Sequence, residues 1–203
     1  MMKPKGKITL LNVYHEPFDK RMYHKLARSF IDNGYEVYSI CPCIDESFPQ
    51  GDIGVKFVLF SCKRSRLYRL LNRIKSVYTL FKLGKELSSD IYIAPEPESW
   101  VSALMIKLFK GGKIVFDMHE HNPNRMAQFF PKFLHKPIEY ITLKVMRLFA
   151  RFTDLIILTR ESFEPLWKGI STPRITVLNT NHLQPICSDI PQSLLEKYAN
   201  IPT

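Results

Sequence analysis

The sequence predicts an α/β fold: a Rossmann-like, doubly wound and mainly parallel sheet of about seven strands. Short apolar segments alternate along the chain with longer segments of helical periodicity. The apolar segments are almost continuously hydrophobic, which is typical of strands covered on both faces. Ionisable residues follow several of these segments directly, as they do at the ligand-binding edge of an open α/β sheet.

Seven segments are predicted as strands, because each is short and rich in Ile, Val, Leu, Tyr or Phe. They are Lys7–Tyr14, Glu36–Cys41, Val55–Ser61, Asp90–Ala94, Lys113–Met118, Asp154–Thr159 and Arg174–Leu178. The longer segments between them are predicted as helices, and these are Lys20–Asn33, Arg66–Leu87, Glu98–Lys110, Ile138–Phe152 and Ser162–Lys168.

Glycine marks the ends of two of these helices. Asn33-Gly34 and Gly111-Gly112 end the first and the third, because glycine accepts the left-handed backbone at which many helices stop. The chain is expected to form one domain over residues 1–185. Residues 186–203 are expected to form a linker or tail that leads towards a further, C-terminal domain.

The chain carries 29 Lys and Arg against 19 Asp and Glu, and its net charge of +10 favours anionic partners. Acidic lipid headgroups and phosphorylated small molecules fit that charge, whereas no nucleic-acid-binding module is recognisable. No uncharged apolar run approaches the roughly 18 residues that span a bilayer, and the run Ile8–Val13 is too short for a signal peptide. The expected location is the cytoplasm, with a peripheral position on the inner face of the plasma membrane as an option.

Ionisable side chains cluster after the first and fourth predicted strands, where a parallel sheet binds its ligands. Asp19 suits either an N-cap of the next helix or a ligand contact. The charge of Arg21 opposes the helix dipole, and its planar fork suits a phosphate or carboxylate. His15 belongs to the same group, Glu96 is predicted to bind a sugar hydroxyl, and Glu98 suits a helix N-terminus.

The end of the fifth predicted strand, Asp117-Met-His-Glu120, holds the sharpest group. Alternation puts Asp117 and His119 on one side of the strand, where a carboxylate can fix the tautomer of an imidazole and raise its basicity. Glu120 suits either the orienting carboxylate or the base. The alternative is a histidine that only satisfies its hydrogen bonds at a strand end.

Several motifs are absent from the sequence. There is no GxGxxG after the first strand and no GxxxxGK[ST], which disfavours a dinucleotide-binding domain and a P-loop NTPase. There is no HExxH, and His119, Glu120 and His121 lie too close together in sequence to form a metal site alone. No metal and no cofactor are therefore expected.

Basic residues accompany apolar ones in two places. Arg66, Arg69 and Arg73 line one edge of the apolar stripe of the second predicted helix. They are either snorkelling arginines on a core-facing helix or contacts to anionic lipid headgroups. Residues 126–136 interleave three phenylalanines with lysines. Those rings either pack on the domain or line the entrance for a lipid-carried substrate.

In these motifs the chain resembles the N-terminal domain of GT-B glycosyltransferases, particularly the large retaining family 4. The resemblance covers about positions 7–185 and rests on the order and spacing of short motifs. They are His15-Glu-Pro-Phe-Asp-Lys-Arg21, the helix that leads into Gly34-Tyr-Glu-Val37, Asp117-Met-His-Glu120, Asp154-Leu-Ile-Ile-Leu-Thr-Arg-Glu-Ser162 and Ile175-Thr-Val-Leu-Asn179. The family's glycine pair after the first strand is replaced here by Tyr14-His15-Glu16.

The resemblance implies a metal-independent, retaining hexosyltransferase with a nucleotide-sugar as its donor. His119 would be the catalytic histidine close to the transferred sugar, with Asp117 and Glu120 beside it, and the loop of Asp19 and Arg21 would face the acceptor. Enzymes of this kind hold most of the nucleotide-sugar site in a C-terminal domain. This chain is therefore expected to be the acceptor-binding half, with little activity unless that domain is supplied in cis or in trans.

The expected reaction is sugar transfer to a cell-envelope glycan or a lipid-linked acceptor. The alternative, from another class of protein, is a non-catalytic module that derives from a glycosyltransferase and binds lipid or a partner protein. A nucleic-acid binder would rest on net charge alone.

Overall fold

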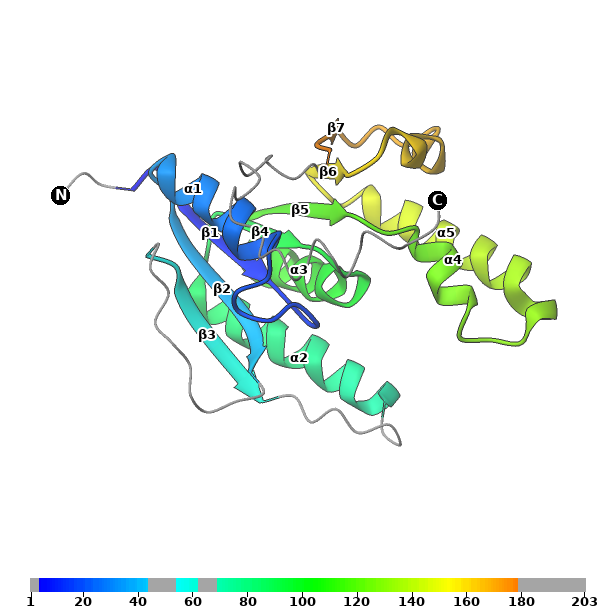
Figure 1. Ribbon diagram of the computed structural model, residues 1–203, viewed down its shortest axis with the longest axis horizontal. Helices are drawn as coiled ribbons and strands as arrows, with labels where there is room; N and C mark the ends of the chain where they lie inside the picture. The colour runs from blue at the N-terminus through cyan, green and yellow to red at the C-terminus, as the bar shows by residue number, and fades with distance from the viewer. Residues whose placement is uncertain (1–3, 44–53, 62–68, 179–203) are drawn as a thin grey trace, which may run out of the picture.

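The computed structural model describes residues 4–43, 54–61 and 69–178 and contains one sheet in which all seven strands run parallel (Figure 1). The strand order is β3-β2-β1-β4-β5-β6-β7, and the predicted fold class is confirmed. The strands are β1 (Lys7–Leu11), β2 (Glu36–Cys43), β3 (Lys56–Ser61), β4 (Ile91–Ala94), β5 (Lys113–Met118), β6 (Leu155–Leu158) and β7 (Arg174–Thr176).

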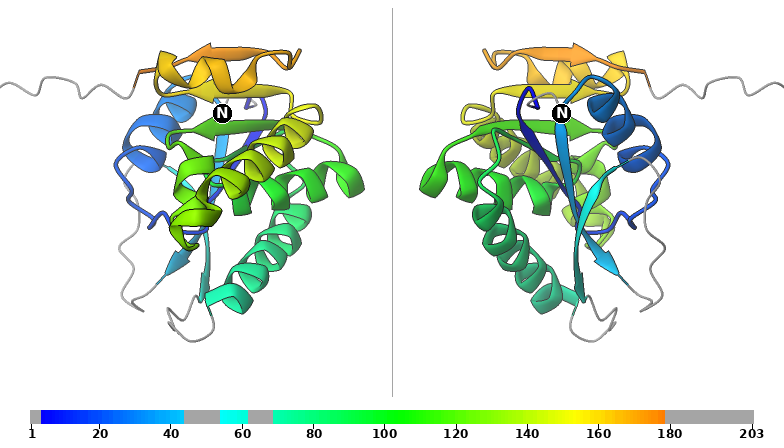
Figure 2. Two further views of the ribbon diagram at one scale, coloured as in Figure 1. Left: turned by 90° about the vertical axis from the view of Figure 1, so that its right-hand side faces the viewer. Right: turned by 90° about the vertical axis from the view of Figure 1, so that its left-hand side faces the viewer.

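Helical segments of α, 3₁₀ and π type connect the strands. They are η1 (Met22–Ala27, π), α1 (Arg28–Asp32), α2 (Arg69–Leu87), α3 (Pro97–Lys110), α4 (Asn122–Ala127), η2 (Lys132–Leu134, 3₁₀), α5 (His135–Ala150) and η3 (Glu161–Trp167, 3₁₀). The segments η1 and α1 lie on one side of the sheet, and α2, α3 and α5 lie on the other (Figure 2).

Two apolar cores follow from the alternation of side chains along the strands. Leu11, Phe116 and Leu158 point to the side of α2, α3 and α5, whereas Ile8 and Val115 point to the side of η1 and α1. Strands with apolar residues on both faces therefore read as continuous apolar runs, which explains why the sequence showed no alternation.

Trp100 fixes α3 against the sheet. Its fully buried indole stacks on Phe116 of β5 with ring centroids 3.9 Å apart and planes 9° apart. The indole Nε1–H donates to Thr153 Oγ1 over 2.8 Å, so the only polar atom of the ring is satisfied. This contact sets the position of the α3 N-terminus, which lies one turn away at the site described below.

Several predicted boundaries were wrong. The helix predicted over Lys20–Asn33 opens as a π-helix, because the carbonyl of Asp19 accepts from the N–H groups of both Tyr23 and His24. The helix predicted from Ile138 begins at His135, where Pro137 falls in the first turn and lacks only an N–H that would have no helical partner.

Other predicted elements also changed. The helix predicted over Ser162–Lys168 is a 3₁₀ segment that contains Pro165, and β1 ends at Leu11 instead of Tyr14. The short helix α4 lies over Asn122–Ala127, between the predicted strand Lys113–Met118 and the predicted helix Ile138–Phe152. The predicted tail at 186–203 lies outside the described residues.

Candidate functional site

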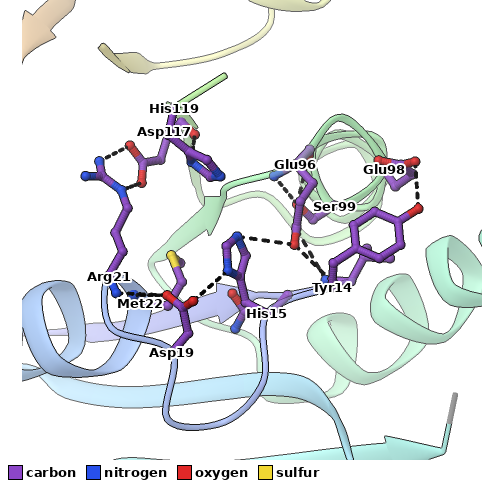
Figure 3. A network of polar contacts seen from close by, with 12 residues as sticks. Tyr14, His15, Asp19, Arg21, Met22, Glu96, Glu98, Ser99, Asp117 and His119 are labelled. Carbon is purple, nitrogen blue, oxygen red and sulfur yellow. Dashed lines mark hydrogen bonds and ion pairs between the residues drawn. The ribbon is translucent and has the colours of Figure 1, made fainter. Parts of the chain in front are cut away.

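The predicted site residues meet at the carboxyl ends of β1, β4 and β5, which are neighbours in the sheet (Figure 3). The chain builds the sheet to one side from β1 through β2 and to the other side from β4 onwards. The strand order therefore reverses between β1 and β4, and such a reversal leaves a crevice above the strand ends. The site lies at this point of reversal.

Asp19 organises the loop after β1. Its Oδ1 accepts from the backbone N–H groups of Arg21 and Met22, each at 2.9 Å, and its Oδ2 lies 3.0 Å from His15 Nδ1. Burial raises the pKa of Asp19, but the bond to His15 and the backbone donors outweigh burial and lower that pKa to about 2. Asp19 thus serves both predicted purposes, because it holds the helix start and orients an imidazole.

Glu96 joins the loop after β4 to the loop after β1. Its carboxylate accepts from the N–H groups of Val13 (3.2 Å) and Tyr14 (3.0 Å) and from the hydroxyl of Ser99 (2.9 Å). The Ser99 hydroxyl also accepts from the Glu96 N–H, which completes a capping box at the start of α3. Glu96 is only 4% exposed, and burial raises its pKa. Its predicted contact to a sugar hydroxyl stays a prediction, while its observed role is to hold the first loop.

Arg21 and Asp117 form a buried two-pronged ion pair. Arg21 Nε donates to Asp117 Oδ2 over 2.8 Å, and the Arg21 NH2 group donates to Asp117 Oδ1 over 2.5 Å. Asp117 is fully buried and Arg21 is 11% exposed. The pair ties the loop after β1 to the end of β5, two segments that are 96 residues apart in sequence. The predicted partner of Asp117 was wrong, because its carboxylate binds the guanidinium and not His119.

His119 is oriented by the backbone. Its Nδ1 lies 3.1 Å from the carbonyl oxygen of Asp117. A carbonyl only accepts, so Nδ1 carries the proton and Nε2 keeps a lone pair. The ring of His119 stands edge-on to that of His15, with centroids 5.3 Å apart.

The two histidines have opposite electrostatic environments. Burial lowers the pKa of His15, but the bond to Asp19 and the charge of Glu96, whose Oε1 lies 3.7 Å from His15 Nε2, raise it overall. The pKa of His119 is lowered, first by burial and then by the positive charges of His15 and Arg21. At neutral pH the site therefore presents an uncharged imidazole at His119.

Among the described residues, no hydrogen bond or ion pair joins Glu120 to the imidazole of His119. Its carboxylate pairs with Arg125 on α4, and both side chains are about half exposed. His121 accepts from the Asn124 N–H and thereby caps α4. The predicted role of Glu120 as orienting group or base stays a prediction.

A shallow pocket beside the site contains residues that the sequence did not single out together. The Tyr14 hydroxyl donates a hydrogen bond to Glu98 Oε1 over 3.0 Å, and the Arg73 guanidinium lies 3.4 Å from the same oxygen. The Arg73 guanidinium also faces the rings of Tyr14 and Phe129, with its carbon 6.0 and 5.0 Å from their centroids. The sequence pointed to Arg73, Glu96, Glu98 and residues 126–136 separately, and no local pattern placed them in one pocket.

Of the three predicted membrane-surface arginines, Arg73 is the one whose side chain the structure describes. Arg73 lies in the pocket between α2, α3 and α4, with its charge offset by Glu98. Arg66 lies outside the described residues, and the side chain of Arg69 is not described. Within residues 4–43, 54–61 and 69–178 no group of three His, Cys, Asp or Glu side chains could hold a metal ion, and no helix is long and apolar enough to span a membrane.

The fold is similar to solved GT-B glycosyltransferases. The chain aligns with sucrose-phosphate synthase from Thermosynechococcus elongatus with a TM-score of 0.63 and 11% identity, over 85% of this chain and 47% of that one. It aligns with CalG4, the calicheamicin glycosyltransferase, with a TM-score of 0.57 and 13% identity, over 94% of this chain and 56% of that one.

A third structure, HepE from Anabaena in complex with UDP and glucose, aligns with a TM-score of 0.54 and 13% identity, over 87% of this chain and 45% of that one. The chain spans about half the length of these structures. The search of curated protein sequences found no match. The profile of Glycosyltransferase Family 4, in contrast, matches residues 20–179, which is most of the chain. The chain therefore belongs to Glycosyltransferase Family 4.

Proposed function

We propose that this chain is the acceptor-binding half of a nucleotide-sugar-dependent, retaining and metal-independent hexosyltransferase. The observation that carries the proposal is the meeting of His15, the Arg21–Asp117 pair and His119 at one sheet edge. The proposed acceptor is a cell-envelope glycan or a lipid-linked sugar.

His119 is the proposed catalytic residue, because its Nε2 lone pair can accept a hydrogen bond from a sugar hydroxyl. Sugar transfer passes through a transition state in which positive charge develops on the sugar ring. An imidazole held neutral by its lowered pKa does not repel that charge. The acceptor oxygen forms the new bond to the anomeric carbon, the bond to the nucleotide diphosphate breaks, and the hydroxyl proton leaves with the diphosphate.

His15, Asp19 and Arg21 are proposed to shape the acceptor side of the crevice. Asp19 and Glu96 favour the protonated form of His15. Its Nδ1–H is held by Asp19, and its Nε2–H is the donor proposed to reach an acceptor oxygen. The shallow pocket of Tyr14 and Phe129 adds ring faces on which a sugar can pack, and Glu98 adds an acceptor for its hydroxyls.

The proposed division of labour rests on coverage, since the chain spans about half of the GT-B structures it resembles. A second half, in cis or in trans, is proposed to bind the nucleotide-sugar and to stabilise the negative charge of the leaving diphosphate.

The test is nucleotide release by the purified chain. It would be mixed with a panel of UDP-, GDP- and ADP-sugars, and free nucleotide would be measured over time. We expect no release above that of buffer, because the donor's diphosphate lacks its stabilising groups. Release at an enzyme-like rate of about 1 s⁻¹ or faster would contradict the proposed division of labour.

A further inference from the structure

An apolar stripe runs along the outer side of α5. Ile141, Val145 and Leu148 of α5 recur at i, i+4 and i+7, which is the spacing of one helix face, and Phe152 follows at i+11 in the turn after the helix. Their exposed fractions are 56%, 42%, 50% and 61%. The opposite side of α5 packs on the domain through Met146 and Ala150. The stripe is therefore a second apolar face of the helix, in addition to the one that the core covers.

Positive charge accompanies this stripe. Residues 129–152 contain five Lys or Arg and a single carboxylate, Glu139, which is partly buried. Lys136, Lys144 and Arg151 are exposed on α5 and the turn after it, and the Lys144 ammonium lies 5.3 Å from the ring centre of Tyr140. A face with apolar side chains at its centre and cations along its edge is complementary to an anionic bilayer surface.

The stripe continues towards the candidate site. Phe133, which is 79% exposed, precedes the first turn of α5. His135 Nε2 donates to the carbonyl oxygen of Phe130 over 3.0 Å, which holds that turn in place. Phe129 lines the shallow pocket beside Glu96. Helix α5 starts at the end of the molecule to which β5 points and runs back along the domain (Figure 1).

We propose that α5, with the turns that flank it, is the surface by which this protein docks on an anionic lipid membrane. Two copies of this face would bring cations against cations, which disfavours a dimer built on it. A membrane offers an apolar interior in which the stripe can be buried and negative charge that can pair with the cations along its edge. The docking surface differs from the one expected at Arg66, Arg69 and Arg73, and it does not depend on the transfer reaction.

The test is sedimentation of the purified chain with vesicles in the absence of any sugar substrate. We expect binding to vesicles that contain phosphatidylglycerol and little binding to pure phosphatidylcholine. Replacing Ile141→Ser and Leu148→Ser together should lower the partition coefficient about tenfold or more, because each side chain loses apolar area to bury. The control Leu59→Ser with Ile175→Ser changes two exposed apolar residues elsewhere and should leave binding unchanged.

A charge series keeps the proposal testable should the apolar variant fold poorly. Lys144→Gln with Arg151→Gln should weaken binding about thirtyfold, which corresponds to about 1 kcal/mol for each of the two removed cations. Lys113→Gln with Lys168→Gln is the matched control of equal net charge. In Tyr140→Trp, the indole emission should shift to shorter wavelength on anionic vesicles. Equal binding by all variants, no binding of the wild type, or a concentration-dependent dimer that Ile141→Ser with Leu148→Ser abolishes would each overturn the proposal.

Discussion

At the scale of single residues, the site is a set of polar groups that are buried only because each has a partner. The side chain of Asp117 has no exposed surface, and both of its carboxylate oxygens accept hydrogen bonds from Arg21. His119 takes its orientation from a backbone carbonyl, so a change of neighbouring side chains leaves its tautomer intact. His15 and His119 have pKa values shifted in opposite directions although their rings are in contact.

The Arg21–Asp117 pair predicts a large loss of stability when one partner is removed. Arg21→Leu leaves a buried carboxylate without a counter-charge and should lower the free energy of unfolding by about 3–5 kcal/mol. Arg125→Leu breaks the half-exposed pair with Glu120 and should cost less than about 1 kcal/mol. Urea unfolding of both variants checks the difference. Equal losses would show that the pair is not buried as described.

The two histidines predict opposite pH dependences of stability. The pKa of His15 is raised by folding, so its stabilising contribution is complete below about pH 6.5 and is lost as the pH rises through its folded pKa. His15→Gln should therefore cost more free energy of unfolding at mildly acidic pH than at alkaline pH. Asp19, with a pKa of about 2, stays ionised throughout this range.

His119→Gln is the matched comparison. Folding lowers the pKa of His119, so protonation of this imidazole at acidic pH favours the unfolded chain. Replacing His119 should therefore cost less free energy of unfolding at acidic pH than at alkaline pH. Chemical denaturation at a series of pH values measures both variants. The same pH trend in the two would refute the assigned environments.

At the scale of elements, loops that follow the strands carry the site and short-range hydrogen bonds shape them. The π-helical start of η1 places Arg21 in front of the helix, where its fork reaches β5. The capping box at Glu96 fixes the start of α3 and, through the same carboxylate, the loop after β1. One side chain thus couples two crossovers of the sheet.

The turn between α3 and β5 predicts a difference between two adjacent glycines. Both have positive φ, 79° at Gly111 and 91° at Gly112. A Cβ at Gly111 would meet nothing within 4 Å, whereas one at Gly112 would lie 2.9 Å from the Tyr92 ring and 3.0 Å from the Ser89 carbonyl oxygen. Gly111→Ala should cost about 1–3 kcal/mol for backbone strain alone, and Gly112→Ala should cost clearly more.

Thermal or urea unfolding of the two alanine variants, side by side, measures that difference. Both positions have positive φ, so the excess loss in Gly112→Ala reports the close approach of Tyr92 and the Ser89 carbonyl to this turn. Equal losses would contradict this packing.

The sequence predicted the strands better than the helices for a physical reason. A strand buried on both faces needs an apolar run, and every such run was visible, including β5 before Asp117. The π-helix at Met22 and the early start of α5 depend on which carbonyl accepts which N–H, and side-chain periodicity does not report that choice.

The same limit of sequence-based prediction applies to the site: positions were predictable and hydrogen-bond partners were not. Parallel strands put Asp19, Arg21, Asp117 and His119 at one edge, so their proximity was predictable from order alone. Their pairing was not, because Asp117 has two possible cationic neighbours and the fold selects Arg21. The packing of Arg73 between Tyr14 and Phe129 joins elements that no local pattern connects.

At the scale of the whole molecule, the two proposed activities occupy different surfaces. The candidate site lies at the carboxyl ends of β1, β4 and β5, and the proposed membrane face lies along the outer side of α5. Residues 129–135 connect them, since Phe129 lines the pocket and His135 begins α5. A membrane-bound acceptor would then reach the crevice along a short path.

Transfer activity of the longest product of the gene, measured with and without His119→Ala, tests the central claim most directly. The exposed His24→Ala on η1 is the control. If the sheet edge holds the transferred sugar, His119→Ala should lower kcat by about 10²–10³-fold and leave the unfolding midpoint close to that of the wild type, while His24→Ala keeps full activity. Wild-type rates in His119→Ala would contradict the assignment of this crevice as the active site.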